Sequence, residues 1–239
     1  MKQLFFNGVG SAAMGMTITG SGTFNAPERD LEIVSIPGRN GDLVIDRGRY
    51  KNIQVTYPVS ICENFAAYAE AARSWLLYPC GYCRLEDDYD PDHFRMALYK
   101  GPLSFTPGFL NQTGEASIAF DCKPQRFLKA GEREITLNGA ALLRNPTGFP
   151  ALPLITVYGS GTGQLQVGDY AIQVLKLDGP LTLDSEMEEA YALPLTADTQ
   201  YRNDCISAPD FPVLGPGTSR ISWSGGITKI EIIPRWWTL

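Results

Sequence analysis

Turn-forming residues interrupt this chain too often for a protein built of long helices. Its 239 residues include 24 glycines and 17 prolines, which separate short apolar segments. A helical bundle or coiled coil cannot accommodate this density, because glycine is flexible and proline lacks the amide that a helix requires. Hydrophobic residues still make up 44% of the chain, enough for substantial cores. The sequence therefore predicts a mainly β protein.

A segment in the N-terminal half has helical periodicity. Apolar residues recur at three- and four-residue spacing over residues 64–77, which places them on one face. We expect Asn64 to cap the first amides and Pro79 to end the helix. Glu70 and Arg73 are spaced to pair on the outer face. The N-terminal half is thus predicted to be β-rich with one α-helix.

The N-terminal half also contains a predicted hairpin that is rich in charge. Strands are expected at 31–34, 43–45 and 53–59, with turns at 37–42 and 46–49. Asn40-Gly41 favours a tight primed turn, because both residues tolerate positive φ. The basic residues either keep the hairpin soluble or make it an arm that grips an acidic neighbouring subunit. The residues predicted for this arm are Arg39, Asn40, Gly41, Arg47, Arg49 and Lys51.

The C-terminal half is predicted to be β throughout. Many short strands at close spacing, separated by glycines, are typical of a sandwich or barrel. The charged stretch at 125–146 indicates a change of direction, so we predict two domains, 1–130 and 131–239. The strands expected in the second domain are 152–158, 164–167, 170–175, 181–183, 219–223 and 227–233.

The distribution of charge limits the classes of partner. The chain carries 20 basic and 26 acidic side chains, a net charge of −6, which argues against a nucleic-acid-binding surface. Residues 1–130 are nearly balanced, with 13 basic and 14 acidic side chains, whereas residues 131–239 carry 7 and 12. The first half suits packing against copies of itself, and the second suits a solvent-facing rim.

The sequence gives little sign of targeting to a membrane. No apolar run approaches the roughly 18 residues that a membrane span needs. The N-terminus turns polar too early for a signal peptide, so we expect synthesis and assembly in a cytoplasm.

The residue types also limit the chemistry. His93 is the single histidine, so a multi-histidine metal site cannot exist and any histidine-dependent catalysis would have to use it. Cys80-x-x-Cys83 is half of a zinc ligand set that His93 and Cys122 could complete. The cysteine count of five is odd, and we favour reduced thiols. We predict no metal and no cofactor.

Two acidic clusters are candidate sites. The run 86–92 lacks the glycine and glutamate of a calcium-binding loop, so we expect a solvated hairpin turn. The second cluster could supply the carboxylate pair of a glycosidase only if two carboxyls faced each other across a cleft; its members are Asp184, Glu186, Glu188 and Glu189. The glycine-rich segment 159–163 has neither a following helix nor the lysine of a phosphate-binding loop, and we expect a β-turn there. We predict that the chain is not an enzyme.

The end of the chain carries two adjacent tryptophans. The segment up to Ile233 alternates as a strand, and Pro234 must end its hydrogen bonding. Trp236 and Trp237 then follow close to the C-terminus, where most chains fray. We predict that at least one of them is largely buried and that the pair is a C-terminal anchor.

Several short motifs follow one another along nearly the whole chain. In this order they resemble the phage distal tail protein (Dit) family, or siphovirus tail-component family. The motifs are 36–53 (IPGRNGDLVIDRGRYKNI), 90–95 (DPDHFR), 120–124 (FDCKP), 145–147 (NPT), 183–186 (LDSE) and 234–237 (PRWW).

The resemblance implies a non-enzymatic structural protein of the virion tail tip, assembled in the cytoplasm of the host bacterium. Members of the family form a hexameric ring that joins the tail tube to the tip, baseplate or adsorption apparatus. The genome passes through the ring without sequence-specific binding. The N-terminal domain builds the ring and sends a hairpin to the next subunit, and the C-terminal domain is a galectin-like β-sandwich. The implied partners are further copies of the chain, the tail tube protein and tail tip proteins.

Two other classes remain open. A carbohydrate-binding module of a host-adsorption apparatus is favoured if the sandwich displays a groove with an exposed Trp or Tyr. The chain is too short for a large inserted module, which argues against direct sugar recognition. A hydrolase is favoured only if two carboxyls oppose each other in a cleft.

Overall fold

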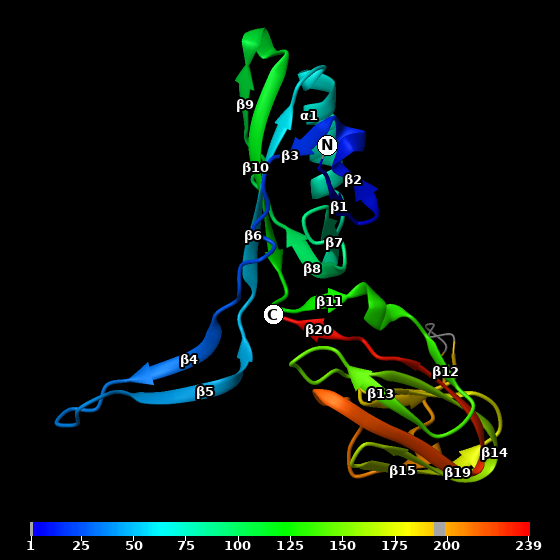
Figure 1. Cartoon of the computed structure of the whole chain (residues 1–239). Helices are drawn as coiled ribbons and strands as arrows, with labels where there is room; N and C mark the ends of the chain where they lie inside the picture. Colours follow the sequence, from blue (N-terminus) through cyan, green and yellow to red (C-terminus); the bar gives the residue numbers. More distant parts are fainter. Residues whose placement is uncertain (1, 194–198) are drawn as a thin grey trace. The chain divides into compact units, whose positions relative to one another are not determined.

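The computed structural model describes residues 2–193 and 199–239, and it divides into two compact units (Figure 1). Unit 1 extends to Arg126 and includes Leu239, and unit 2 is Phe127–Thr238. The chain is mainly β, which confirms the predicted fold class. No helix in the described residues is long and apolar enough to cross a membrane.

Unit 1 is built on an antiparallel sheet with the strand order β2-β1-β7-β8-β10-β6-β3, and β9 pairs with β10. Short 3-10 helices lie at Ser11–Met14 (η1) and Phe109–Asn111 (η2). The strands are β1 (Leu4–Phe6), β2 (Val9–Gly10), β3 (Met16–Ile18), β6 (Ile53–Ile61), β7 (Cys83–Asp87), β8 (His93–Tyr99), β9 (Phe105–Gly108) and β10 (Thr113–Cys122).

The core of unit 1 lies between this sheet and the helix α1 (Phe65–Leu77). Alternate side chains of β6, from Ile53 to Ile61, are buried, as period-2 geometry requires. The Trp75 indole N–H donates to the carbonyl of Phe6 at 3.1 Å, which fixes the helix to β1.

Helix α1 confirms the helix predicted over 64–77, with one correction at its start. Ala72 and Trp75 are buried on the predicted face, and Arg73 pairs with Glu70 at 2.8 Å on the outer face. Asn64 does not cap the helix with its side chain. It adopts the left-handed conformation, with φ 49°, which asparagine tolerates, and it turns the backbone into the helix instead.

The predicted hairpin is also present, as β4 (Arg29–Val34) and β5 (Leu43–Tyr50), which pair with each other alone in a two-stranded sheet within the described residues. Its turn differs from the prediction. Residues 35–42 form a loop in which Gly38 and Gly41 have positive φ but Asn40 does not, so the connection is not a tight primed turn. The turn predicted at 46–49 is wrong too, because these residues continue β5.

Unit 2 consists of strands that pair antiparallel around a second core. Short 3-10 helices lie at Lys129–Glu132 (η3) and Asn203–Cys205 (η4). The strands are β11 (Arg126–Leu128), β12 (Ile135–Leu137), β13 (Ala141–Asn145), β14 (Leu154–Val167), β15 (Tyr170–Leu177), β16 (Leu181–Asp184), β17 (Glu189–Tyr191), β18 (Ile206–Ser207), β19 (Gly217–Ile233) and β20 (Trp237–Thr238).

Two of these strands are longer than the sequence predicted. The expected strands 152–158 and 164–167 join into β14, and 219–223 and 227–233 join into β19, so the predicted turn at 159–163 is wrong. Glycines allow this continuity, because the two backbones approach too closely for side chains. A Cβ at Gly226 would lie 1.7 Å from the carbonyl oxygen of Ser160, and one at Gly159 would lie 2.0 Å from that of Gly226.

The two long strands each contribute to both layers of unit 2. One half of each strand pairs in the order β13-β19-β14-β15-β18, and the other half in the order β12-β19-β14-β16-β17. The buried side chains of both groups belong to one apolar cluster. This arrangement fits the predicted sandwich, in which two sheets pack face to face.

Candidate interaction surface

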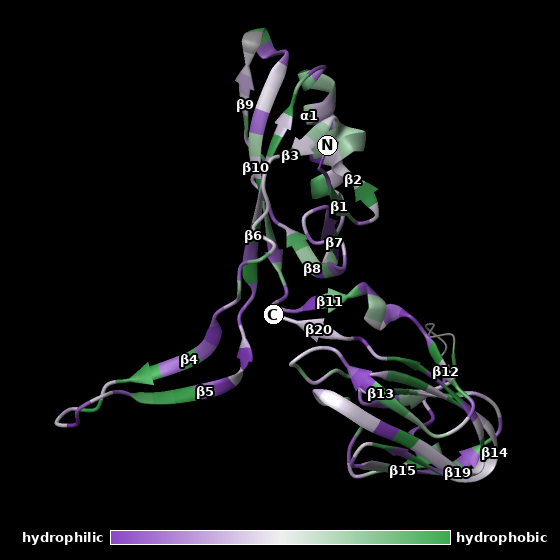
Figure 2. Cartoon of the chain, in the orientation of Figure 1, coloured by the Kyte–Doolittle hydropathy of each residue, from purple (hydrophilic) through white to green (hydrophobic). Residues whose placement is uncertain are grey.

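A group of exposed apolar side chains of unit 1 lies on the β4–β5 hairpin, which we call the arm (residues 28–51). Figure 2 shows hydrophobic residues on both of its strands toward the tip and hydrophilic ones nearer its root. The distal arm is defined here by six large apolar residues, each more than a third exposed. They are Leu31, Ile33, Val34, Leu43, Val44 and Ile45.

Cross-strand ion pairs occupy most of the charged side chains of the arm. Arg47 reaches Glu32 at 2.6 Å, and Arg49 reaches Asp30 at 2.7 Å. The hydrogen bond from Arg49 lowers the pKa of the Asp30 carboxyl. Lys51 lies 3.5 Å from Glu28. Three of the predicted arm cations, Arg47, Arg49 and Lys51, therefore already have carboxylate partners inside the hairpin.

The tip residues of the predicted arm lie outside its two strands. Arg39, Asn40 and Gly41 all lie in the exposed loop between the strands, beyond the ion pairs. The backbone N–H of Arg39 donates to the carbonyl of Ile36 at 3.1 Å. The structure thus brings Arg47, Arg49 and their carboxylates together and leaves Arg39 at the end of the arm.

Sequence reasoning named the cations of the arm and missed its apolar side chains. The available signal was the absence of alternation in Leu43-Val44-Ile45. A strand with one buried face alternates apolar and polar residues, whereas an uninterrupted apolar run is typical of a strand covered on both faces.

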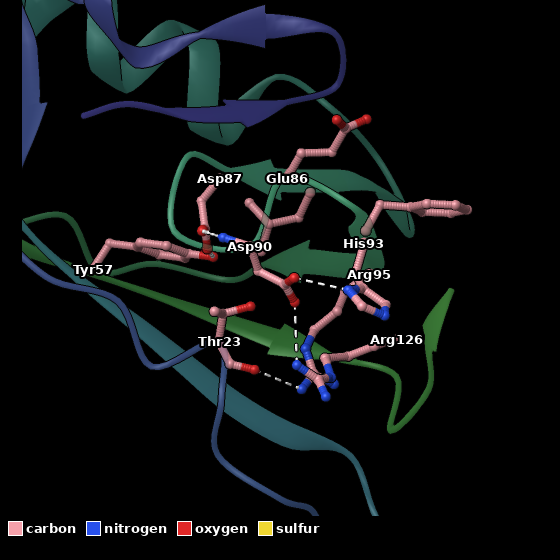
Figure 3. Close-up of a pocket in the computed structure, with 10 residues that line it drawn as sticks. Thr23, Tyr57, Glu86, Asp87, Asp90, His93, Arg95 and Arg126 are labelled. Atoms are coloured by element: carbon pink, nitrogen blue, oxygen red, sulfur yellow. Dashed lines mark hydrogen bonds and ion pairs between the residues drawn. The ribbon is translucent and has the colours of Figure 1, made fainter. Parts of the chain in front are cut away.

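A polar cluster lies at the base of the segment that leads into the arm (Figure 3). Arg95 is buried, and burial lowers the pKa of its guanidinium. Its Nη atoms donate to the carbonyls of Thr23 and Pro124, both at 3.0 Å, and to that of Asn25 at 3.3 Å. Arg95 therefore joins the chain entering the arm to the end of β10.

The acidic run 86–92 contributes to the same cluster. It connects β7 and β8, as predicted, but it is not fully solvated, because Asp87 is buried and accepts a hydrogen bond from the Tyr57 hydroxyl at 2.7 Å. Asp90 lies 2.7 Å from Nδ1 of His93 and 3.1 Å from Nη1 of Arg126 (Figure 3).

The polar cluster has no room for a ligand. The cavity between its residues has a volume of about 10 Å³, close to the minimum that a single water molecule needs. Asp90 already binds His93 and Arg126, and Arg95 donates to backbone carbonyls. The cluster therefore acts as a structural network that supports the segment entering the arm.

The cysteines differ in their burial. Cys122 is buried in the core of unit 1, where burial raises the pKa of its thiol to about 12. Cys80 is exposed and Cys83 is half-buried. Within the residues that the structure describes, no group of three or more His, Cys, Asp or Glu side chains is arranged to hold a metal ion.

The second acidic cluster, which includes Asp184 and Glu186, lies in unit 2. Asp184 is buried and accepts two hydrogen bonds from Arg235, at 2.6 and 3.0 Å. Burial opposes its ionisation, but the hydrogen bonds from Arg235 prevail, so the pKa of Asp184 is lowered. Glu186 is exposed and lies 3.5 Å from the same guanidinium. Asp184 thus stays ionised and paired, which does not suit a general acid.

The C-terminal tryptophans have different surroundings within unit 2. Trp236 is 5% exposed and belongs to the core, and Gly131 leaves space for its backbone. Trp237 is half-buried, and its ring stacks on Phe149 with centroids 4.7 Å apart. The Trp237 indole N–H donates to the carbonyl of Pro150 at 2.8 Å.

Comparison with solved structures finds the same fold over the whole chain. The crystal structure of the phage SPP1 Dit protein (gp 19.1), a hub of the adsorption apparatus in phages that infect Gram-positive bacteria, aligns with a TM-score of 0.77 and 12% identity over 100% of both chains. A chain of the activated phage P2 baseplate with Ca aligns with a TM-score of 0.52 and 8% identity over 97% of each chain. The same baseplate with Sr gives a TM-score of 0.50 and 10% identity, over 97% of this chain and 98% of that one.

Comparisons of sequence add no relative. No family model matches the chain, and no curated protein matches it. The resemblance to distal tail proteins predicted from short motifs is confirmed in the fold, which this chain shares with the SPP1 Dit protein.

Proposed function

We propose that this chain is a structural hub protein of a phage tail, which joins the tail tube to the proteins of the tip or baseplate. The observation that carries the proposal is the full-length likeness in fold to the SPP1 Dit protein, with a TM-score of 0.77. The phage is expected to be of the siphovirus type, and the chain to be located at the tip of the virion tail after assembly in the host cytoplasm.

The subunits close into a ring, expected to be a hexamer, whose channel passes the genome without sequence-specific contacts. The exposed arm supports this proposal, because a hairpin with apolar residues on its surface needs a partner. A contact between the arm of one subunit and the body of the next is heterologous, and a repeated heterologous contact can close into a ring. Unit 1 builds the ring, and unit 2 is the galectin-like sandwich at its rim.

The mass of the native particle tests the ring. We expect the purified chain, alone or with the tail tube and tip proteins, to give a discrete multiple of 26.2 kDa, six chains in a hexamer. Antibodies against the chain are expected to label the distal end of isolated tails. A two-fold dimer with both arms at its axis, or labelling elsewhere on the particle, would contradict the proposal.

We propose no catalytic role. Asp184 is paired with Arg235, and the carboxylate of Asp90 binds His93. A carbohydrate-binding role receives little support from the C-terminal tryptophans, since Trp236 is buried and Trp237 stacks on Phe149. Cleavage of glycan or peptidoglycan by the purified chain that disappears on Asp184→Asn would overturn this part of the proposal.

A further inference from the structure

The connection between α1 and β7 contains two cysteines that the proposed function leaves unused. Its sequence is Cys80-Gly81-Tyr82-Cys83. All five cysteines of the chain are free thiols. Cys80 is exposed, and Cys83 is half-buried at the start of β7. Two thiols this close along the chain are candidates for joining into one disulfide.

The two ends of this connection are fixed by different elements. On the first side, Pro79 restricts its own φ to about −65°. It follows the last turn of α1, where the Tyr78 N–H donates to the carbonyl of Ser74 at 3.1 Å. On the second side, Cys83 pairs with Ala97 of β8 within the sheet. A bond between the two thiols would therefore join the helix to the sheet.

The two residues between the cysteines form a bend that has room to adjust. Gly81 has a φ of 85°, in the left-handed region that favours glycine, and the backbone bends there. Among the described residues, apart from its chain neighbours, no atom lies within 4 Å of the place that a Cβ at Gly81 would take. Tyr82 is held more firmly, because its hydroxyl accepts a hydrogen bond from Nδ2 of Asn52 at 2.7 Å.

The spacing of the pair suits a disulfide. A four-residue reverse turn brings its first and last Cα atoms within about 7 Å of each other. A disulfide needs a Cα separation of about 4.4–6.8 Å. Closing the bend at Gly81 into such a turn therefore brings Cys80 and Cys83 into range of a bond.

The other three cysteines are poor partners for this pair. Cys122 and Cys205 are buried in the cores of units 1 and 2, where an oxidant does not reach them. Cys62 is exposed, but it precedes α1 whereas Cys80 follows it. The 13 residues of this helix span about 20 Å, which is too far for a disulfide.

We propose that Cys80 and Cys83 form a modification site, a pair of thiols that is oxidised to a disulfide by a small-molecule disulfide such as oxidised glutathione. The disulfide joins the end of α1 to β7. This inference goes beyond the proposed function, and the bond itself does not depend on it. A cytoplasm keeps such thiols reduced, whereas the surroundings of a cell oxidise them. At the tip of a virion tail, the location given by the proposed function, the pair is reduced during assembly and oxidised after release.

The oxidation proceeds by two exchange steps. The thiolate of Cys80 attacks one sulfur of the small disulfide, whose S–S bond breaks and releases one thiolate. The thiolate of Cys83 then attacks the sulfur of Cys80, which forms the protein disulfide and expels the second small thiolate. The two released thiolates take up the two protons, so two protein thiols are oxidised and one small disulfide is reduced to two thiols. Exposure assigns the first attack to Cys80, because the oxidant reaches it directly.

Peptide mapping of the full-length chain tests the site. The reduced, folded chain is incubated with oxidised glutathione, its remaining thiols are alkylated in denaturant, and it is digested with trypsin without reduction. Trypsin cuts after Arg73 and Arg84, so both cysteines fall on the peptide 74–84, whereas Cys62 falls on 52–73. We expect peptide 74–84 to lose two hydrogen atoms and to carry neither glutathione nor an alkyl group.

Single variants supply the controls. In Cys83→Ser the second step has no nucleophile, so peptide 74–84 is expected to keep one glutathione on Cys80. The variant Cys80→Ser changes an exposed position and is expected to form no disulfide within this peptide. Cys62 is a matched exposed thiol, expected to carry one glutathione in the parent. Its replacement in Cys62→Ser is expected to leave the result for peptide 74–84 unchanged.

The opposite results are distinct. A parent peptide 74–84 with two alkylated thiols, or with glutathione kept on Cys80, would overturn the site. A disulfide that links this peptide to 52–73 would overturn the pairing.

The joining of α1 to β7 has its own readout. In the Cys62→Ser background, oxidation is expected to raise the unfolding temperature of unit 1, because the bond restricts the unfolded chain, and to have no effect once Cys83→Ser is added. An equal or lower unfolding temperature after oxidation would exclude this role. None of these measurements uses assembly, so their failure and the failure of the proposed function are distinguishable.

Discussion

The ion pair between Asp184 and Arg235 offers the sharpest test of how unit 2 holds the end of the chain. The Asp184 carboxylate accepts two hydrogen bonds from Arg235, and backbone N–H groups of Glu186 and Met187 bond Oδ1 at 3.0 and 3.3 Å. The Tyr191 hydroxyl adds a bond to Oδ2 at 3.2 Å. The Asp184 side chain is 4% exposed, so water cannot replace these bonds.

The change Asp184→Asn keeps the size of the side chain and removes its charge. One amide oxygen can still accept the backbone bonds, but the amide nitrogen then faces the guanidinium of Arg235 as a second donor. Breaking a buried pair by removing one partner costs about 3–5 kcal/mol, because the other charge remains buried and unpaired. Since Arg235 is 26% exposed and keeps partial contact with water, we expect the lower end, about 3 kcal/mol.

Thermal and denaturant unfolding of the full chain measure this cost. We expect the transition assigned to unit 2 to fall by roughly 10 °C, with the transition of unit 1 unchanged. The matched control is Glu186→Gln, because Glu186 is 59% exposed and touches the same arginine at 3.5 Å. Its effect is expected to stay below about 0.5 kcal/mol, the usual range for exposed positions.

The pH dependence provides a second readout. The pKa of Asp184 is lower in the folded protein than in the unfolded chain, since the hydrogen bonds from Arg235 outweigh the effect of burial. The stability from this group is therefore full above the unfolded pKa, about 3.9, and is lost as the pH falls through the folded value. The difference between parent and Asp184→Asn is expected to shrink below about pH 4. An equal loss for both variants, or a difference independent of pH down to acid unfolding, would refute the reasoning.

Three further predictions concern the arm and the chain end. Arg47→Gln with Arg49→Gln is expected to change self-association by no more than a few fold at any salt concentration, because these cations pair inside the arm. A large loss of self-association would show that these cations contact another subunit. Trp236→Ala is expected to cost about 3–5 kcal/mol in the unfolding of unit 2, as a buried aromatic does, and an unchanged transition would deny its anchoring role. Arg95→Met is expected to speed the amide hydrogen exchange of residues 22–27, because Arg95 donates to the carbonyls of Thr23 and Asn25, with little change elsewhere in unit 1. An equal increase in exchange rate throughout unit 1 would contradict the role of Arg95 at the base of the arm.

The elements that the sequence predicts best are those with local causes. The helix at 64–77 has apolar periodicity and a closing proline, and the charged hairpin has strands on either side of turn residues. The continuity of β14 and β19 has a tertiary cause. Gly159 and Gly226 read as turn residues, yet each is required because the facing backbone leaves no space for a side chain. A single sequence does not reveal which backbone segment faces a glycine.

The ion pairs also divide into those with a local cause and those with a tertiary cause. The pairing of Glu70 with Arg73 follows from helical spacing, whereas the pairing of Arg47 with Glu32 depends on the register of two strands. Once that register is known, the arginine has a carboxylate partner within its own hairpin, and its contact with another subunit stays a prediction. A charge in a predicted arm therefore says little about binding until its intrachain partners are known.

The apolar run Leu43-Val44-Ile45 is informative because the chain itself leaves it uncovered. Such a run is typical of a strand buried on both faces, and local pattern and native surroundings normally agree in a natural protein. Here they disagree within the described residues, since all three side chains are more than a third exposed. Disagreements of this kind are expected at functional sites, where the missing neighbours belong to another molecule. The exposed apolar pattern of the arm therefore supports the proposed contact between subunits.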